Sequence, residues 1–506
     1  MTLLADLVAT SRQVAATSSR SAKVSTLAEL LRRLGPGEVA PAVAMLSGEP
    51  RQGRFGVGWR RLADLEIEPA AEPSLTVGEV DRALDRLALT TGTGSVAARN
   101  RELEDLFARA TAAEGEFLFQ LLTGGLRQGA LEGIMVDAVA KAAGVPVATL
   151  RRAVMLAGDL CATAALALDP GGGQPALAAV GLQPMRPVLP MLAASSPTVA
   201  DALATTGRAS VEWKLDGARI QLHRDGDDVG IYTRNLNDVT GRLPGIVALA
   251  RALPARTFIL DGEALGWSED GDRPDRFQEI MSRFGSLVAS SLAARFFDCL
   301  HVDGRDLLDE PLTTRLDVLE QLAGVWRVPA ILTEDPDEAA AFSDDALAAG
   351  HEGVMVKAAG SLYAAGRRGG SWRKVKPVET FDLIVIGAEW GHGRRKGWLS
   401  NLHLGARDPS GGPPVMVGKT FKGLTDELLT WQTAALLARE THREGITVFV
   451  RPELVVEIAL DGVQSSTRYP GGLALRFARV KRYRPDKSPS EADTLGSLQA
   501  LLRRDR

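Results

Sequence analysis

The strongest constraint on this chain is a short stretch near its middle, VEWKLDGARIQ at residues 211–221. A lysine after an apolar run, then an acidic residue and glycine, then a second apolar run, predict a strand, a tight turn and another strand. We therefore expect Lys214 at the edge of a sheet. A lysine amine becomes a nucleophile only when desolvation or neighbouring cations remove its proton. Gly217 would allow a phosphate or nucleoside to approach the backbone closely.

Taken alone, these residues equally describe a hairpin with a surface lysine, so the rest of the chain has to decide. Its 506 residues are too many for one hydrophobic core, and about two to four domains are expected. The composition, 45% hydrophobic and 24% charged, is typical of a globular protein. A net charge of −4 does not indicate a general nucleic-acid binder, but it allows local basic patches.

Changes in hydrophobic periodicity predict three domains. Residues 1–183 repeat Ala and Leu at helical spacing and predict an all-α domain. Glycine and proline at 170–175 and 183–190 mark a boundary, after which strands dominate residues 184–377, a domain whose mixed α+β class is implied by a family resemblance of its motifs. Residues 378–506 show short strands and one helix near 426–439, which favours a small five-stranded barrel of the OB-fold type, although strand count alone fits other small barrels nearly as well.

Polar residues follow or end the strands expected in the middle domain. Arg234 follows one strand and could hold a phosphate or ribose through a forked hydrogen-bond pattern. Glu263 is placed at the end of another and could bind a ribose hydroxyl or a metal. Phe296 or Phe297 could stack on a purine, and Glu352 precedes a further strand where it can hold a metal. Each has an ordinary alternative: a turn arginine, a solvated acid or a core phenylalanine.

A basic segment near residue 370 completes this series. Lys374 and Lys376 alternate along a predicted strand at 372–375 and so point to one face. Two ammonium groups on one face repel each other unless an anion lies between them, and a triphosphate or nucleotidyl phosphate would serve. Arg368 lies just upstream.

The stretch around Lys214 resembles the Lys-x-Asp-Gly-x-Arg motif of the covalent nucleotidyltransferases, which are the DNA ligases, RNA ligases and messenger RNA capping enzymes. The later motifs match this family in the same order over about 160 residues. The resemblance implies that Lys214 is the nucleophile and that Glu263 and Glu352 bind a metal. Asp216 is implied to orient substrate groups, and Lys376 to lie nearby. The residues implied to line the nucleotide pocket are Glu212, Arg219, Arg234, Glu263, Phe297, Arg368 and Lys374.

The basic segment 475–487 resembles the last motif of the family, Arg-x-Asp-Lys. This implies that Arg484 and Lys487 orient the departing pyrophosphate, so the C-terminal domain must close over the nucleotide. Relatives often have Arg-Phe-Pro-Arg where this chain has Arg476-Phe-Ala-Arg479, and we expect only a change in local backbone rigidity.

The segment 121–133 resembles part of the helical DNA-binding domain of ATP-dependent DNA ligases. Its glycine-flanked Arg127 before a helix start could also bind a phosphate on physical grounds. Further arginines and lysines either extend a basic face or are simply solvated: Arg20, Lys23, Arg32, Arg33, Arg51, Arg54, Arg60 and Arg61. A basic turn at Gly391–Gly397 could contact DNA phosphates or could be a solvated loop.

The resemblance implies an ATP-dependent DNA ligase that seals nicks in duplex DNA with ATP and Mg²⁺ (or Mn²⁺). An RNA ligase or capping guanylyltransferase shares the lysine motif, but the long helical domain favours a DNA ligase. NAD⁺ dependence is disfavoured because the chain lacks the cysteines of a zinc module, having only Cys161 and Cys299. A DNA-binding scaffold without activity is disfavoured because the motif residues are intact.

Location and assembly follow from weaker signals. No apolar run reaches the roughly 18 residues of a membrane span, and residues 1–6 lack a basic leader. Together with the mildly apolar surroundings of both cysteines, this predicts a cytoplasmic, nucleoid-associated protein. The implied fold predicts a monomer that wraps nicked DNA.

Overall fold

The computed structural model describes most of the chain, in two compact units. The first is Met1–Ser343 with Val354–Lys374, and the second is Asp344–Gly353 with Val375–Arg506. Arg127, predicted as a possible phosphate ligand, and the arginines at 54, 60 and 61 lie outside the described residues. The described residues are 1–53, 55, 62, 65, 67–92, 94–126, 132–266, 292–364, 368–377 and 379–504.

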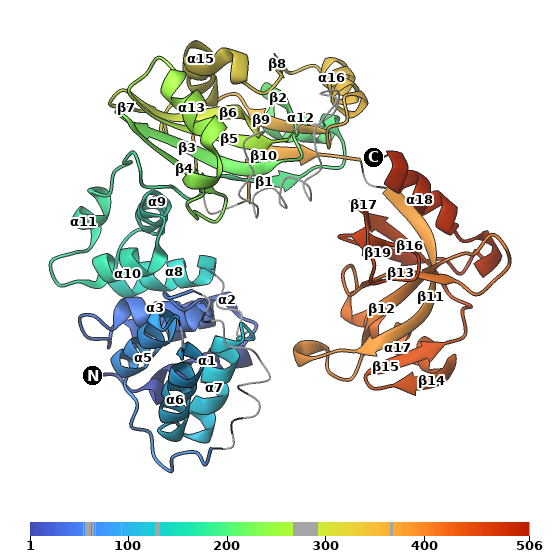
Figure 1. Ribbon diagram of the computed structural model, residues 1–506, viewed down its shortest axis with the longest axis horizontal. Coiled ribbons are helices and arrows are strands. Elements are labelled where there is room, and N and C mark those ends of the chain that lie inside the picture. The colour runs from blue at the N-terminus through green and yellow to red at the C-terminus, as the bar shows by residue number, and fades with distance from the viewer. Residues whose placement is uncertain are drawn as a thin grey trace. The chain divides into compact units, whose positions relative to one another are not determined.

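The N-terminal part of the first unit is helical, as the sequence predicts (Figure 1). Two helices begin with capping boxes, in which Thr76 and Glu79, and likewise Thr111 and Glu114, satisfy each other's backbone N–H groups. The helices of this region are α1 (Leu4–Ala16), α2 (Arg20–Leu31), α3 (Val39–Ser47), α5 (Val77–Leu89), α6 (Ser95–Ala108), α7 (Ala112–Leu122), α8 (Glu132–Ala143), α9 (Val147–Ala157), α10 (Leu160–Leu168) and α11 (Gln174–Ala178).

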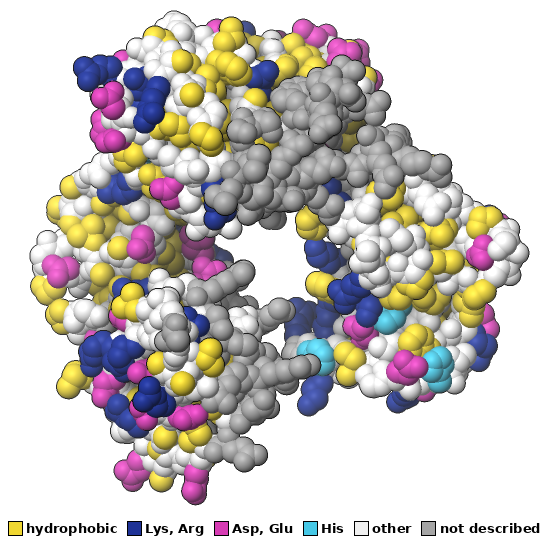
Figure 2. Space-filling model, in the orientation of Figure 1, with side chains coloured by type: hydrophobic (Ala, Val, Ile, Leu, Met, Phe, Trp, Pro, Cys, Tyr) yellow, Lys and Arg dark blue, Asp and Glu magenta, His cyan; other side chains and the backbone are white. Residues whose placement is uncertain are grey.

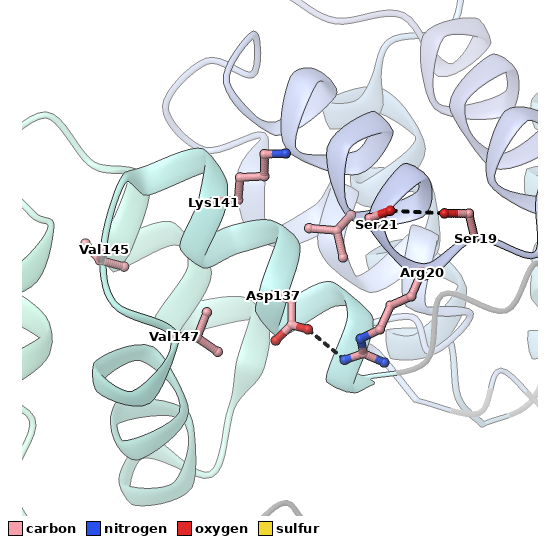
Figure 3. Close-up of a pocket in the computed structure, with 8 residues that line it drawn as sticks. Ser19, Arg20, Ser21, Asp137, Lys141, Val145 and Val147 are labelled. Carbon is pink, nitrogen blue, oxygen red and sulfur yellow. Dashed lines mark hydrogen bonds and ion pairs between the residues drawn. The ribbon is translucent and has the colours of Figure 1, made fainter.

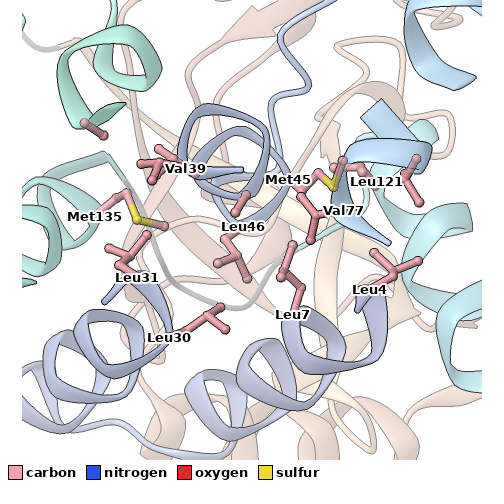
Figure 4. Close-up of a cluster of buried hydrophobic side chains, with 14 of the residues drawn as sticks. Leu4, Leu7, Leu30, Leu31, Val39, Met45, Leu46, Val77, Leu121 and Met135 are labelled. Atoms are coloured by element: carbon pink, nitrogen blue, oxygen red, sulfur yellow. The ribbon is translucent and has the colours of Figure 1, made fainter. Parts of the chain in front are cut away.

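These helices enclose one apolar core. Leu7 of α1, Leu30 of α2, Leu46 of α3, Val77 of α5 and Met135 of α8 are almost fully buried in it (Figure 4). Because the apolar residues recur at three- and four-residue spacing, each helix buries one stripe. Burial of apolar area therefore holds the helical region together, and this burial begins in α1.

A groove runs between α2 and α8 and has a volume of about 640 Å³ (Figure 3). Arg20 at the start of α2 donates to Asp137 of α8 at 2.7 Å, and Lys141 donates to Ser25 at 2.8 Å. Its cations are thus already paired within the protein, which makes the groove a weak candidate for an anion site.

The rest of the first unit contains two sheets and the helices packed on them (Figure 1). One sheet has the strand order β1-β10-β9-β2-β8 and the other β4-β3-β5-β6-β7. The elements are β1 (Leu192–Ser195), α12 (Val199–Thr206), β2 (Ala209–Trp213), β3 (Ala218–Asp225), β4 (Asp228–Thr233), η1 (Thr240–Arg242), α13 (Pro244–Ala252), β5 (Thr257–Leu265), β6 (Ala293–Val302), β7 (Arg305–Asp306), α15 (Leu312–Ala323), η2 (Gly324–Trp326), β8 (Ala330–Thr333), α16 (Pro336–Ala348), β9 (Val354–Ala358) and β10 (Arg368–Val375).

Each sheet has its own role in placing the motifs. Ile246 of α13 and Leu319 of α15 pack on Leu222 of β3 and Phe258 of β5, so these helices cover one face of the second sheet. The first sheet carries β2, whose end leads directly into Lys214. The mixed α+β fold predicted for this region is confirmed.

The C-terminal unit is rich in strands, also as predicted. Its long strand β11 pairs with β12 along one side, and with β16 and then β15 along the other. Strand β11 therefore lies between β12 on one side and β15 and β16 on the other. The elements are β11 (Glu379–Trp390), η3 (Gly393–Arg395), β12 (Leu399–Ala406), β13 (Val415–Thr420), α17 (Asp426–Leu437), β14 (Glu440–Glu444), β15 (Thr447–Val450), β16 (Val455–Leu460), β17 (Gly462–Ser465), β18 (Leu473–Arg476), β19 (Arg479–Tyr483), η4 (Pro489–Glu491) and α18 (Leu495–Arg504).

One polar cluster on this unit, which we call the Glu389 cluster, joins three neighbouring strands. Glu389 of β11 accepts from Asn401 at 2.7 Å and His403 at 3.0 Å, both on β12, and from Lys419 of β13. Burial alone would raise the pKa of Glu389, but these three hydrogen bonds lower it to about 2. The carboxylate therefore stays charged and ties the strands together.

Candidate active site

Lys214 lies directly after β2, at the end of a strand as the sequence predicts. The loop that follows packs tightly on β5, because a Cβ at Gly217 would come 2.5 Å from the carbonyl oxygen of Ala264 and 2.6 Å from Cγ of Glu263. Any side chain at 217 would have to push β5 away. In the structure β5 makes a close approach to Gly217, and the approach of a nucleotide at this glycine stays a prediction.

Glu263 is a carboxylate on which the charge of Lys214 acts. It lies within β5, opposite Arg219 of β3, and not at a strand end as expected. Burial raises the pKa of Glu263 to about 8, with Asp261 and Asp216 adding to the rise and the charges of Lys214 and Arg219 opposing it. Lys214, Asp216, Arg219 and Asp261 thus all lie close enough to Glu263 to act on its charge.

Arg219 is held in place by the protein itself. Its Nε and Nη2 donate to the two oxygens of Asp261 at 3.0 and 2.6 Å, and its Nη1 donates to the carbonyl of Met191 at 2.6 Å. Tyr363 donates to the same Asp261 at 2.8 Å. A bidentate pair of this kind fixes the plane of the guanidinium. Arg219 is therefore a rigid positive group beside the strand that carries Glu263.

Phe297 lies in the middle of β6, next to the buried ammonium of Lys357, a residue without a predicted role. The ammonium of Lys357 on β9 lies 4.3 Å from the ring centroids of both Phe297 and Trp372. Lys357 also donates to the carbonyl of Phe297 at 3.3 Å. Such cation–π contacts are strengthened by burial. The signal was present, since Lys357 ends the strand after Glu352, but a terminal lysine is ordinarily solvated.

The same lysine neutralises Glu212. The Glu212 carboxylate is 99% buried and lies 2.5 Å from the ammonium of Lys357, while its other oxygen accepts from Ser210 at 2.9 Å. Burial raises the pKa of Glu212 and the charge of Lys357 opposes that rise. Glu212 and Phe297, predicted separately to line a nucleotide pocket, are thus linked through one side chain.

Three further residues of this unit were predicted to line the nucleotide pocket. Arg234 lies exposed in the turn after β4 and makes no hydrogen bond or ion pair with the described residues. Lys374 lies on β10, where its carbonyl accepts from the backbone N–H of Ser196 at 3.0 Å. The side chain of Arg368 lies outside the described part of the chain.

Glu352 and Lys376 belong to the second unit. The ammonium of Lys376 lies 3.9 Å from Glu352 and 2.8 Å from Asp461, and Asp461 also accepts from Arg479 at 3.2 Å. Gly353 has φ of +132°, and a Cβ there would lie 2.4 Å from the carbonyl of Val375. This close approach sets Glu352 beside Lys376.

Arg484 and Lys487 are held together by one carboxylate of the same unit. Asp382 accepts from Arg484 at 3.0 Å and from Lys487 at 2.5 Å, and Arg484 also donates to Asp486 at 2.7 Å. The two residues assigned to pyrophosphate are therefore ion-paired within their own domain.

Glu263 and Glu352 each offer carboxylate oxygens, the ligands that a hard cation such as Mg²⁺ prefers, and Mg²⁺ also keeps several waters. Across the described residues, no group of three or more His, Cys, Asp or Glu side chains could hold a metal by itself. A Mg²⁺ bound at either carboxylate would therefore need further ligands from substrate and water. Within the same residues, no helix is both long and apolar enough to cross a bilayer.

A lysine at the end of a strand, together with a buried glutamate and a fixed arginine in a domain of two sheets, fits a nucleotidyltransferase domain. Family comparisons agree: residues 190–376 match the ATP dependent DNA ligase domain, 395–487 its C-terminal region, and 65–140 the DNA ligase N terminus. The chain belongs to the ATP-dependent DNA ligase family.

Relatives match along the whole chain. A probable DNA ligase of Saccharopolyspora erythraea is 59% identical over 99% of this chain and 98% of that protein. A second, from Rhodococcus jostii, is 58% identical over 99% of each. The solved structure named Pmar-Lig_Pre shares the fold, with a TM-score of 0.65 and 18% identity over 95% of this chain and 99% of that one. The protein is thus an enzyme of a family that uses ATP and seals nicks.

Proposed function

We propose that this enzyme seals nicks in duplex DNA in three steps, with Lys214 as the residue that carries AMP. The observation that supports the proposal best is the grouping of Lys214 with Glu263 and Arg219 around a loop that Gly217 locks onto β5. A lysine placed by rigid strands, and surrounded by charges of both signs, has the preorganisation that phosphoryl transfer requires.

In the first step, neutral Lys214 attacks the α-phosphorus of ATP. The bond from Nζ to phosphorus forms while the bond to the bridging oxygen breaks, and pyrophosphate leaves. We assign to Arg219 the neutralisation of charge on the phosphate oxygens, and to Phe297 stacking on the adenine. Arg234, Lys374 and Arg368 complete the pocket. A Mg²⁺ or Mn²⁺ ion held by Glu263 and Glu352 would supply further positive charge at the phosphates.

The next two steps use DNA. A 5′-phosphate oxygen at the nick attacks the phosphorus of AMP, the bond to nitrogen breaks, and Lys214 leaves as an amine once protonated. Asp216 orients the groups involved, and the 3′-hydroxyl then attacks the 5′-phosphate and releases AMP. In the first step, Arg484 and Lys487 orient the departing pyrophosphate, and Lys376 contacts the triphosphate. This requires the C-terminal domain to reach the nucleotide during adenylylation.

We assign DNA contact to the helical region and to the basic turn Gly391–Gly397. The proposal for the helical region is limited by pairing, since Arg20 and Arg51 are bonded to Asp137 and Asp81. Figure 2 likewise shows Lys and Arg side chains interspersed with acidic ones on the visible face of this region. A monomer that encircles DNA, the domain bounds 1–183, 184–377 and 378–506, and a cytoplasmic, nucleoid-associated location stay predictions.

The test is transfer of label from α-labelled ATP to the protein in the presence of Mg²⁺. We expect label on the wild type and on Lys141→Ala, a control lysine of the helical region, but none on Lys214→Ala. Nicked DNA should then discharge the label with strand joining. A preference for nicked RNA, or for GTP, would favour an RNA ligase or capping enzyme instead, and absence of label from ATP, GTP and NAD⁺ would favour a scaffold.

A further inference from the structure

A buried carboxylate in the C-terminal unit lies under the two cations that the proposed function assigns to pyrophosphate. Asp382 is 92% buried near the start of β11, a strand whose next three residues are apolar. Its backbone is fixed on both sides by Asp493, which accepts from the N–H of Asp382 at 2.7 Å and donates to its carbonyl at 2.8 Å. A charged side chain in such a position is costly unless it is paired.

The pairing of Asp382 is specific. One of its oxygens accepts from both Lys487 at 2.5 Å and Arg484 at 3.0 Å, while the other accepts from Arg484 at 3.2 Å. The side chains of Asp382 and Arg484 are 90% and 85% buried, so solvent screens this contact little. One carboxylate thereby sets the distance between an ammonium and a guanidinium that lie three residues apart in a turn.

The neighbouring strand makes this arrangement more demanding. Glu457 of β16 is directly opposite Asp382, and like charges in such positions destabilise a sheet. Arg484 lies between them, 3.0 Å from Asp382 and 3.8 Å from Glu457, and Arg482 donates to Glu457 at 2.8 Å. The two acids need these cations, and the cations are held in one place by the two acids.

We propose that Asp382 is a positioning residue for adenylylation, which acts by presenting Lys487 and Arg484 together to the β- and γ-phosphates of ATP. This inference rests on the proposed function. Asp382 does not touch substrate in the proposal. It orients Lys487 and Arg484, which do touch substrate. Both side chains still have N–H donors available for phosphate oxygens, because an ammonium has three donors and a guanidinium five.

The inference separates the reaction steps. Pyrophosphate takes part only when Lys214 is adenylylated by ATP, or when that adduct is reversed by added pyrophosphate. Sealing of a nick that already carries AMP involves no pyrophosphate. Asp382 should therefore matter for the first step in both directions and be nearly silent in the last.

The experiment compares Asp382→Asn with wild type in the full chain, using ATP, inorganic pyrophosphate and a pre-adenylated nick as separate probes. Loss of charge-assisted hydrogen bonds should lower kcat/KM for adenylylation and for pyrophosphorolysis by about tenfold or more. Sealing of the pre-adenylated nick should change less than about twofold. Glu440→Gln is the matched control, because Glu440 is a surface carboxylate of the same unit in a bidentate pair with Arg443.

Two further variants guard against a purely structural effect. Asp382→Glu keeps the charge and should recover part of the adenylylation rate. In a Lys487→Gln background, Asp382→Asn should cost much less than it does alone, since a positioning residue has little left to position. The proposal is overturned if Asp382→Asn leaves adenylylation unchanged, or if it slows all three reactions equally. If the wild type itself takes no label from ATP, the proposed function fails first.

Discussion

The buried ion pair between Asp298 and Arg315 offers the sharpest test of how the sheet β4-β3-β5-β6-β7 is held. Asp298 follows Phe297 on β6 and Arg315 belongs to α15, and both side chains are fully buried. Arg315 donates to the carboxylate at 2.7 and 3.0 Å, and its remaining Nη1 donates to the carbonyls of Glu310 and Ser361 at 2.8 and 2.9 Å. The pair therefore ties helix, strand and the loop before β10.

The substitution Asp298→Ala would leave two guanidinium N–H groups without an acceptor in a dry interior. Breaking a buried pair from one side costs about 3–5 kcal/mol. In Asp298→Asn the volume is kept and one oxygen still accepts, so the loss should be smaller, about 1.5–3 kcal/mol for the charge-assisted bonds. Glu310→Gln is the control, because the Arg305–Glu310 pair is exposed and should contribute no more than about 1 kcal/mol.

Urea unfolding, followed by tryptophan fluorescence and circular dichroism, measures these differences. We expect the midpoint to fall in the order Glu310→Gln, Asp298→Asn, Asp298→Ala with little change in slope. Adenylylation at low temperature, where the variants remain folded, should stay measurable, because Asp298 does not face the nucleotide in the proposal. A loss of unfolding free energy below about 1 kcal/mol for Asp298→Ala would refute the reasoning. It would mean that the variant structure relaxes and gives the guanidinium of Arg315 new partners.

Three other changes follow from the geometry. Gly217→Ala should slow labelling of Lys214 by about 100-fold, since a shift of about 1 Å in a reacting group has that effect, and normal labelling would show that β5 yields easily. Glu389→Gln should lower stability at pH 7. The folded pKa of Glu389, about 2, lies below the ordinary 4.5, so the stability advantage of the wild type should shrink as the pH falls from 4.5 to 2. A difference in unfolding free energy that does not depend on pH would contradict this. Neutralising Arg394, Arg395 and Lys396 should weaken nick binding and flatten its salt dependence while adenylylation persists; equal salt slopes would exclude the basic turn from the interface.

Local patterns were enough to predict much of the fold. The strand expected after the turn that follows Lys214 became β3, and the helix expected near 426–439 became α17. Period-two and helical spacing report burial, and burial decides which elements form. The strand that carries Lys374 was predicted too short, because Gly369 and Gly370 lower strand propensity and gave no apolar alternation.

The site was predicted in its residue types but not in its pairings. A sequence shows that Glu212 and Lys357 each follow an apolar run, yet only the register of β2 against β9 brings the two strands together. The same holds for Gly217, whose neighbour proved to be β5. Contacts across a sheet depend on register and strand order, and neither is encoded in a local window.

These pairings bear on how the cations assigned to phosphate in the proposed function could release as well as bind it. Arg219 is bonded to Asp261, Lys376 to Asp461, and Arg484 with Lys487 to Asp382. In each case a carboxylate of the protein already occupies part of the cation's hydrogen-bonding capacity. An unpaired cation would bind triphosphate and pyrophosphate alike and would hold the product.

Phosphate must instead share or replace a bond that the protein already makes, so the net gain per contact is the difference between two charge-assisted bonds and not the whole of one. That difference can be largest where charge builds up on the departing oxygens, which is where stabilisation speeds the reaction. On this reasoning, removing a paired carboxylate such as Asp382 frees a cation and yet slows adenylylation, because orientation is lost and ground-state binding is gained.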